Sequence, residues 1–200
     1  VNGLNVLEYP REVKKCIGYL PEKPPLYPDM TVLEYLRFVA EIKGIKKKSF
    51  TAEREKILEL VKIGDVRGRL IGNLSKGYQQ RVGIAQAIIN DPEVLILDEP
   101  TIGLDPRQIH DIRALIQDIG KERTIILSSH ILPEVNQVCD RIIVINNGKL
   151  AAVDSPENLK KSLKKFSSVA IKLRRDDKSV EARQHLLSIP GILSVTEAGS

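Results

Sequence analysis

Two adjacent carboxylates, Asp98 and Glu99, directly follow a run of four apolar residues at positions 94–97. An apolar run without alternation is typical of a strand buried on both faces, as in a parallel sheet. Ligands of open parallel sheets bind at the carboxyl ends of the strands, where these two carboxylates would stand. One of them could hold Mg²⁺ there while its neighbour orients an attacking water molecule. Taken alone, the two residues could equally be solvated loop carboxylates.

A second stretch whose residues could bind a ligand, LSKGYQQR at residues 74–81, precedes this strand. Ser75 can cap a helix that begins at Lys76, and Gly77 lets a ligand approach the backbone closely. The N–H groups and the dipole of such a helix start favour a phosphate group. An ordinary capped surface helix would explain the same residues, so this stretch alone leaves both interpretations open.

Four segments in this order resemble the motifs of the ATP-binding-cassette (ABC) ATPases. Residues 74–81 resemble the signature motif, and LILDEP at 95–100 resembles the Walker B strand. IGLD at 102–105 resembles the D-loop, and His130 follows a further apolar segment as the switch histidine does in that family. The resemblance spans about residues 1–155. It implies a subunit that binds and hydrolyses ATP with Mg²⁺.

In this family two ATPase domains face each other head to tail, with ATP between the phosphate loop of one and the signature of the other. The resemblance implies that the signature residues bind the nucleotide held by the partner domain: Ser75, Lys76, Gly77 and Gln79. Ser75 and Gly77 would contact the γ-phosphate. Lys76 replaces the glycine that is commonest at the third signature position.

The remaining roles that the resemblance implies fall on the residues after the predicted strands. Asp98 would hold Mg²⁺ and Glu99 would polarise the attacking water, so Glu99 and His130 are the expected catalytic residues. His130 would contact the γ-phosphate and sense its loss. Asp105 would link the two nucleotide sites across the dimer.

Glu22 stands where the family more often has the glutamine of the Q-loop. It follows a short apolar strand at residues 16–20 and begins a proline-rich loop that cannot be helical. A glutamate could still bind Mg²⁺ or water, so Glu22 is included among the expected nucleotide-site residues. A plain loop carboxylate is the alternative.

The resemblance implies an α/β fold of the P-loop NTPase type, and the local patterns along the chain predict its elements. Thr31 and Glu34 form a capping box, and Thr51 is predicted to cap a second helix; with the signature helix they would make a helical subdomain over about 31–90. Asp105-Pro106 begins a helix to Gly120, and Asn147-Gly148 predicts a hairpin. Further elements are expected at 124–128 (strand), 133–138 (helix), 141–145 and 149–153 (strands) and 155–165 (helix).

We predict two domains. Residues 1–165 would be a partial ABC ATPase domain, whose parallel sheet is incomplete at the N-terminus. Residues 166–200 would be the start of a small α+β extension, an incomplete β-α-β segment with strands at 168–173 and 192–196 and a helix at 181–187.

The phosphate loop of this family, G-x-x-x-x-G-K-[ST], is absent from the 200 residues. The one Gly-Lys step, at residues 148–149, is followed by Leu150. In the family this loop lies upstream of the Q-loop strand, so we expect a chain truncated before Val1, inactive by itself. A natural protein that never carried the loop is the alternative.

The composition of the chain argues against some kinds of partner. With 42% hydrophobic and 28% charged residues the chain is ordinary for a soluble globular protein, and its 4% aromatics argue against a base-stacking surface. Cys16 and Cys139 lack metal-ligand spacing and are expected as reduced thiols. No apolar run reaches the roughly 20 residues that span a bilayer. Lysine and arginine gather at 46–48 and 160–175, most simply as solvated faces.

The leading hypothesis is therefore the ATPase subunit of an exporter-type ABC transporter. Its expected partners are a second ABC ATPase domain and transmembrane permease subunits, without nucleic acid, at the cytoplasmic face of the cell membrane. Two alternatives stay open: an ABC ATPase that acts on nucleic acid or ribosomes, and a non-hydrolysing interaction module.

Overall fold

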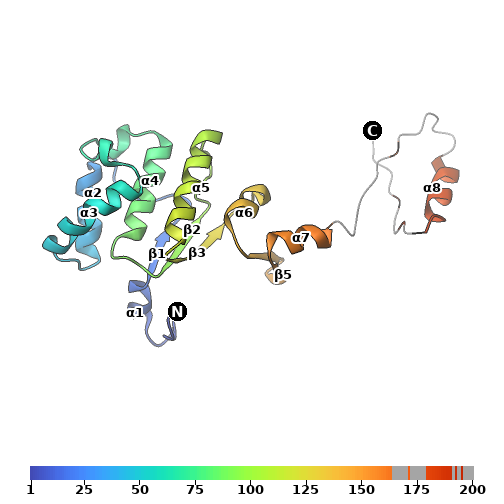
Figure 1. Cartoon of the computed structure of the whole chain (residues 1–200), viewed down its shortest axis with the longest axis horizontal. Coiled ribbons are helices and arrows are strands. Elements are labelled where there is room, and N and C mark those ends of the chain that lie inside the picture. Colours follow the sequence, from blue (N-terminus) through green and yellow to red (C-terminus); the bar gives the residue numbers. More distant parts are fainter. Residues whose placement is uncertain (164–170, 172–178, 191, 193–194, 196–200) are drawn as a thin grey trace. The chain divides into compact units, whose positions relative to one another are not determined.

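The computed structural model describes residues 1–163, 171, 179–190, 192 and 195 (Figure 1). The chain divides into two compact units, Val1–Pro156 and Glu157–Ser200. Within the first unit, the centre is a three-stranded parallel sheet in the order β1-β2-β3. Its strands are β1 (Ile17–Leu20), β2 (Val94–Asp98) and β3 (Thr124–Ser128). The predicted parallel sheet is thus confirmed.

The central strand β2 is buried on one face and partly buried on the other, although its unbroken apolar run predicts burial on both. Leu95 and Leu97 have no exposed surface, and Val94 and Ile96 are partly buried. Parallel pairing aligns Leu20 with Leu97 on one side and Asp98 with Ser128 on the other. All three strands therefore end at one edge of the sheet, where β2 delivers its two carboxylates.

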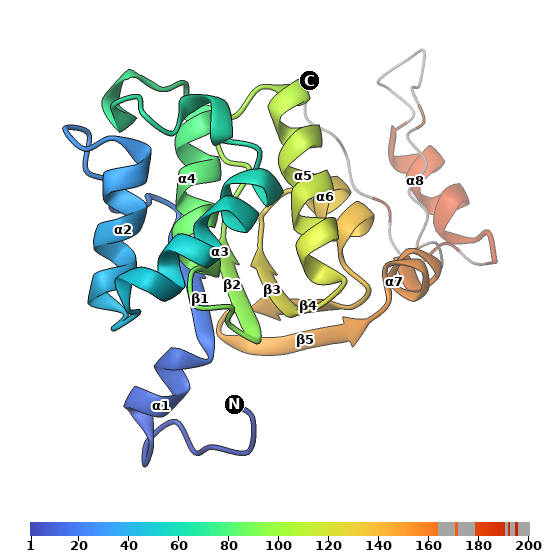
Figure 2. The same ribbon diagram turned by 60° about the vertical axis from the view of Figure 1, so that its left-hand side comes forward.

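Helices on the β1 side of the sheet form the predicted helical region (Figures 1 and 2). Thr31 caps α2 through the predicted box with Glu34. These elements share one apolar core with the sheet, with Tyr35, Leu36 and Ile71 among its most buried side chains. The bounds are α1 (Pro10–Lys15), α2 (Val32–Ile42), α3 (Lys47–Leu60), the short 3₁₀ turns η1 (Gly64–Val66) and η2 (Ile71–Asn73), and α4 (Lys76–Ile88).

The predicted start of the second helix at Thr51 is wrong. α3 begins at Lys47, and the Thr51 hydroxyl donates a hydrogen bond back to the carbonyl oxygen of Lys47 (2.9 Å). A threonine inside a helix can bond to the preceding turn in this way, so its presence alone does not mark an N-cap. The buried side chain of Phe50 explains the earlier start, because it lies on the same face as Ile57 and Leu58 in the shared core.

The chain after β2 also follows the predicted order. α5 (Pro106–Gly120) covers one face of the sheet and buries Ile112, Leu115, Ile116 and Ile119 (Figure 2). α6 (Leu132–Val138) follows β3, and β4 (Ile142–Asn146) pairs with β5 (Lys149–Asp154) as an antiparallel hairpin. Asn147 and Gly148 turn this hairpin with φ of 49° and 72°, as an Asn-Gly signal predicts.

The second unit is described only in part. α7 (Pro156–Leu163) leads into it, and α8 (Ser179–Leu187) confirms the helix expected at 181–187. The strands expected at 168–173 and 192–196 fall mainly on residues outside the described part, and the predicted domain division stays a prediction. Among the described residues, no helix is long and apolar enough to cross a membrane.

Two glycines allow α4 to lie directly against β1 and the loop after it. A Cβ at Gly18 in β1 would collide with the carbonyl oxygen of Ala87 in α4 and lie 2.8 Å from Leu95 Cδ1. A Cβ at Gly83 in α4 would lie 2.7 Å from Leu20 Cδ1 and 3.0 Å from Pro24 Cγ. This close packing fixes the helix that begins with the signature-like residues against the sheet.

Gly18→Ala should therefore destabilise the chain. The added methyl group has no room between a backbone carbonyl and a buried leucine, so we expect a loss of about 1–3 kcal/mol in the free energy of unfolding, as for other overpacked cores. Gly64→Ala is the matched control, since nothing lies within 4 Å of a Cβ there. Urea denaturation of both variants measures the difference, and equal stability would contradict the proposed close packing.

Candidate functional site

The candidate site lies at the carboxyl edge of the parallel sheet. Because β2 and β3 pair Asp98 with Ser128, the residues that follow these two positions emerge side by side. The structure thereby brings together three predicted site residues, Asp98, Glu99 and His130. Glu99 and His130 are 31 positions apart in sequence, and the register of the two strands brings them together.

Ser128 connects the two strand ends and was missed by the sequence analysis. Its hydroxyl donates to Asp98 Oδ1 (2.5 Å) and accepts from the backbone N–H of Glu99 (3.1 Å). The same N–H also donates to the carbonyl oxygen of Ser128 (3.2 Å). A hydroxyl at the end of the strand before His130 was the available signal, but the partner could only be known from the register.

Glu99 and His130 form a hydrogen-bonded pair. Imidazole Nδ1 lies 2.8 Å from Glu99 Oε1; the Glu99 side chain is 18% exposed and that of His130 is 67% exposed. The hydrogen bond with Glu99 and then the charge of that carboxylate raise the pKa of His130, with smaller contributions from Glu134 and Glu22. A protonated imidazole beside Glu99 is a suitable partner for an anionic group.

Glu99 is held in an unusual way. Its φ is 45°, in the left-handed region that residues other than glycine seldom adopt, and strain of this kind is common at functional sites. Its second oxygen, Oε2, is buried and has no hydrogen-bond partner among the described residues. A buried carboxylate oxygen needs a hydrogen-bond donor, and a water molecule can supply one.

The fit of Mg²⁺ can be judged from these donors. Among the described residues, no group of three or more His, Cys, Asp or Glu residues could hold a metal ion. Mg²⁺ does not require such a cage, because it is commonly bound by one or two carboxylates together with waters and substrate phosphates. The carboxylate of Asp98 supplies a hard oxygen ligand of this type, and the unpartnered oxygen of Glu99 suits a water molecule.

The signature-like residues begin α4, as predicted. Ser75 is the N-cap and accepts a hydrogen bond from the Tyr78 N–H (3.4 Å). Gly77 is covered by the Gln108 side chain, whose Cδ would lie 2.8 Å from an added Cβ, and the ammonium of Lys76 lies against Gly103. The start of α4 therefore packs against the turn at 102–105 and the first turn of α5.

The predicted nucleotide contact of Gln79 meets a competing arrangement. Its side-chain nitrogen donates to the carbonyl oxygens of Ile71 (3.1 Å) and Leu74 (3.3 Å), which fixes the loop before α4. Asp105 caps α5 by accepting from the Gln108 N–H (2.9 Å). Both residues thus have a structural task in the chain beside any role toward a nucleotide.

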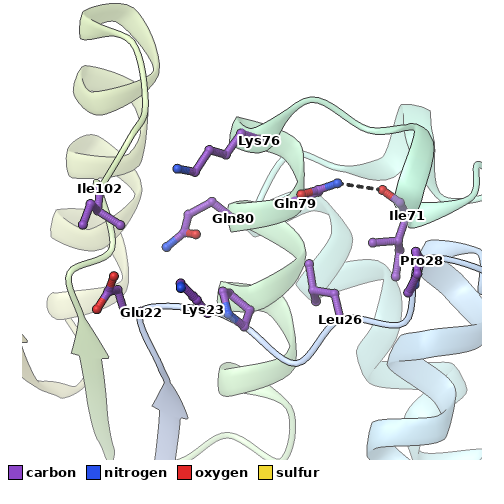
Figure 3. A pocket seen from close by; sticks show the side chains of 10 residues that line it. Glu22, Lys23, Leu26, Pro28, Ile71, Lys76, Gln79, Gln80 and Ile102 are labelled. Atoms are coloured by element: carbon purple, nitrogen blue, oxygen red, sulfur yellow. Dashed lines mark hydrogen bonds between the residues drawn. The ribbon is translucent and has the colours of Figure 1, made fainter.

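Glu22 lines a groove of about 410 Å³ between the loop after β1 and the start of α4 (Figure 3). Lys76 and Gln80 reach the same groove from α4, and Ile102 from the turn after β2. Gln80 is only 6% exposed, and its side-chain nitrogen has no partner among the described residues. Sequence reasoning missed Gln80, because nothing in LSKGYQQR distinguishes a buried glutamine from an exposed one.

The parallel sheet, with its polar site at the carboxyl edge, defines an α/β fold of the P-loop NTPase type. Two solved structures share it. One is the ATP-binding subunit of an ABC transporter, with a TM-score of 0.68, 28% identity and coverage of 82% of this chain and 69% of that chain. The other is CbiO1 of Clostridium perfringens, described as part of the ABC transporter complex CbiONQ, with a TM-score of 0.69, 26% identity and coverage of 89% and 69%.

Sequence comparison agrees. The family model described as ABC transporter matches residues 3–102. The bacitracin transport ATP-binding protein BcrA of Bacillus licheniformis is 42% identical over 82% of this chain and 53% of its own length. The ABC transporter ATP-binding protein NatA of Bacillus subtilis is 36% identical over 81% of this chain and 67% of its own length. The chain belongs to the ABC transporter ATP-binding family, and it spans about half the length of the curated relatives it matches first.

Glu99→Gln should lower the pKa of His130 toward its ordinary value, because the variant removes the carboxylate that holds the proton on Nδ1. NMR titration of the His130 ring measures this, with the exposed Glu122→Gln as the matched control. By linkage, a raised pKa stabilises the folded chain fully below the unfolded value of about 6.5, and this contribution is lost as pH rises through the folded-state pKa. An unchanged His130 titration in Glu99→Gln would show that the pair does not form in solution.

Proposed function

We propose that this chain supplies the hydrolytic residues of the ATPase subunit of an ABC transporter. It also supplies the signature surface, which is formed by Ser75, Lys76 and Gly77 at the start of α4. The observation that carries the proposal is the meeting of Asp98, Glu99, Ser128 and His130 at the carboxyl edge of a parallel sheet. Membership of the family supports ATP as the substrate. Transport would be powered through separate membrane subunits, in an exporter-type system.

Each residue at the edge has a task in this proposal. Asp98 holds Mg²⁺, and the Ser128 hydroxyl fixes the orientation of its carboxylate. Mg²⁺, when bound, neutralises charge on the phosphates. Glu99 orients a water molecule and accepts its proton, while its backbone N–H stays anchored to Ser128. His130, kept protonated to a higher pH by Glu99, donates to the γ-phosphate.

The signature surface acts on the nucleotide of a second ATPase domain. In a head-to-tail pair, Ser75, Lys76 and Gly77 face the γ-phosphate held by the partner domain, and Asp105 connects the two sites. The N–H groups at the start of α4 are suited to an anion. Gln79 serves this surface by fixing the loop before α4, and Glu22 acts from the loop after β1 on the metal or the attacking water.

The partners and the location follow from the same proposal. We expect a second ABC ATPase domain, as a homodimer or heterodimer, and transmembrane permease subunits that hold the chain at the cytoplasmic face of the membrane. The CbiONQ complex named for the solved relative supports such an assembly. We expect no nucleic acid as a partner.

The first test is calorimetric titration of the 200-residue chain with ATP and Mg²⁺. The sequence contains no G-x-x-x-x-G-K-[ST] loop, whose backbone amides and lysine normally hold the phosphates. We expect no binding tighter than the millimolar range and no turnover by the chain alone. Micromolar binding would overturn the proposal that these residues supply only part of the nucleotide site, without its phosphate loop.

The second test places Glu99→Gln in a protein that also carries a phosphate loop. Removing the base should lower the rate of ATP hydrolysis by about 10²- to 10⁴-fold and leave ATP binding in place. Glu122→Gln is again the control, since this exposed residue lies away from the site. Steady-state phosphate release measures the rate, and undiminished turnover in Glu99→Gln would remove Glu99 from the role of the base.

A further inference from the structure

A buried contact joins the turn after Glu99 to the helix after His130. The Thr101 hydroxyl donates to Glu134 Oε2 at 2.6 Å, and the two residues are only 5% and 9% exposed. Carboxylates are seldom buried to this degree unless they are paired or hydrogen-bonded. Neither residue belongs to the motifs that gave the functional proposal its residue roles.

Thr101 and Glu134 each lie in a short segment that is held by local backbone hydrogen bonds. Thr101 lies in successive turns in which the Ile102 N–H donates to the Glu99 carbonyl (3.1 Å) and the Leu104 N–H to the Thr101 carbonyl (3.2 Å). Glu134 lies in the first turn of α6, and its N–H donates to the carbonyl of Ile131 (2.9 Å), the residue after His130. Local backbone hydrogen bonds thus connect Thr101 to Glu99, and Glu134 to the residue that follows His130.

The two segments meet at three successive points. Ser128 bonds Asp98 at the strand ends, His130 bonds Glu99 in the middle, and Glu134 bonds Thr101 at the far side. In the middle contact the His130 side chain is 67% exposed and the Glu99 backbone has a positive φ, so local burial does little to hold this pair in place. Its geometry depends on the contacts that flank it.

We propose that Thr101 and Glu134 are positioning residues, whose buried hydrogen bond holds the turn after β2 against the start of α6 so that the Glu99 carboxylate meets the His130 imidazole. The same bond fixes the beginning of residues 102–105, where Gly103 packs against Lys76 of the signature. The role of this alignment in ATP hydrolysis rests on the proposed function. The alignment of Glu99 with His130 does not depend on that function.

Thr101→Val tests the proposal, because it replaces the hydroxyl by a methyl group of similar size. Thr101→Ser, which keeps the hydroxyl, is the matched control. The readout is NMR titration of the His130 ring and the chemical shift of its Nδ1, in the 200-residue chain without nucleotide. Circular dichroism and the dispersion of the spectra verify that each variant is folded.

We expect Thr101→Val to lower the pKa of His130 by at least about half of the change caused by Glu99→Gln, and Thr101→Ser to restore it. Three carboxylates act on His130: Glu99 after β2, Glu134 on α6 and Glu22 after β1. All three carboxyl groups remain in Thr101→Val, so a fall in the His130 pKa that is accompanied by a changed Nδ1 shift reports lost alignment with Glu99. A folded Thr101→Val with the titration and Nδ1 shift of the original chain would overturn the proposal.

If the unpaired Glu134 prevents Thr101→Val from folding, the double variant Thr101→Val/Glu134→Met removes both polar partners and avoids a buried unpaired carboxylate. It is compared with Glu134→Gln, which also lacks the charge but keeps an oxygen that can accept from Thr101. The Nδ1 signature of the Glu99 bond should be lost in the double variant and kept in Glu134→Gln. Identical His130 behaviour in both would overturn the proposal.

The outcome is separable from that of the functional proposal. The titrations need neither ATP nor a partner, so an aligned pair dependent on Thr101 would stand even if Glu99→Gln hydrolysed ATP normally. Conversely, a hydrolytic role for Glu99 would stand if Thr101→Val left His130 unchanged.

Discussion

The parallel pairing of β2 with β3 is the constraint on which the candidate site depends. It sets Asp98 opposite Ser128, and this single register brings a carboxylate, a hydroxyl and an imidazole to one edge of the sheet. A shift by one residue would reverse the faces of β3 relative to β2 and separate these groups. The buried Leu95 and Leu97 resist such a shift, because it would move apolar side chains out of the core.

A second constraint connects the sheet to the signature-like residues. α4 lies against β1 because Gly18 and Gly83 have no side chains at their closest approach. The ammonium of Lys43, at the end of α2, also holds α4 by donating to the carbonyl oxygens of Gln86 and Ile89 at the end of that helix (3.1 and 2.8 Å). Burial lowers the pKa of Lys43 to about 8, so this contact is most sensitive to alkaline conditions. The position of Ser75 at the other end of α4 is thus set by contacts far from any ligand.

The sequence predicts those features that depend on short stretches of chain. The apolar run before Asp98 predicts the central strand, Thr31 with Glu34 predicts the start of α2, and Asn147-Gly148 predicts the hairpin; all three are confirmed. The contacts made by Ser128, Gln80 and Glu134 could not be predicted, because each joins segments whose approach is set by packing across the fold. The start of α3 was misjudged for a related reason, since the burial of Phe50 outweighed a plausible cap at Thr51.

Two departures from the family's usual residues lie in the same groove. Glu22 stands in place of a glutamine after β1, and Lys76 in place of a glycine at the start of α4, and both line the groove that Gln80 also reaches. Among the described residues, neither side chain forms an ion pair. The two opposite charges therefore line the same groove without contacting each other. A carboxylate at position 22 adds negative charge that contributes to raising the pKa of His130. A lysine on the facing helix brings the opposite charge to the same groove, which gives a physical reason for the two departures to occur in one chain.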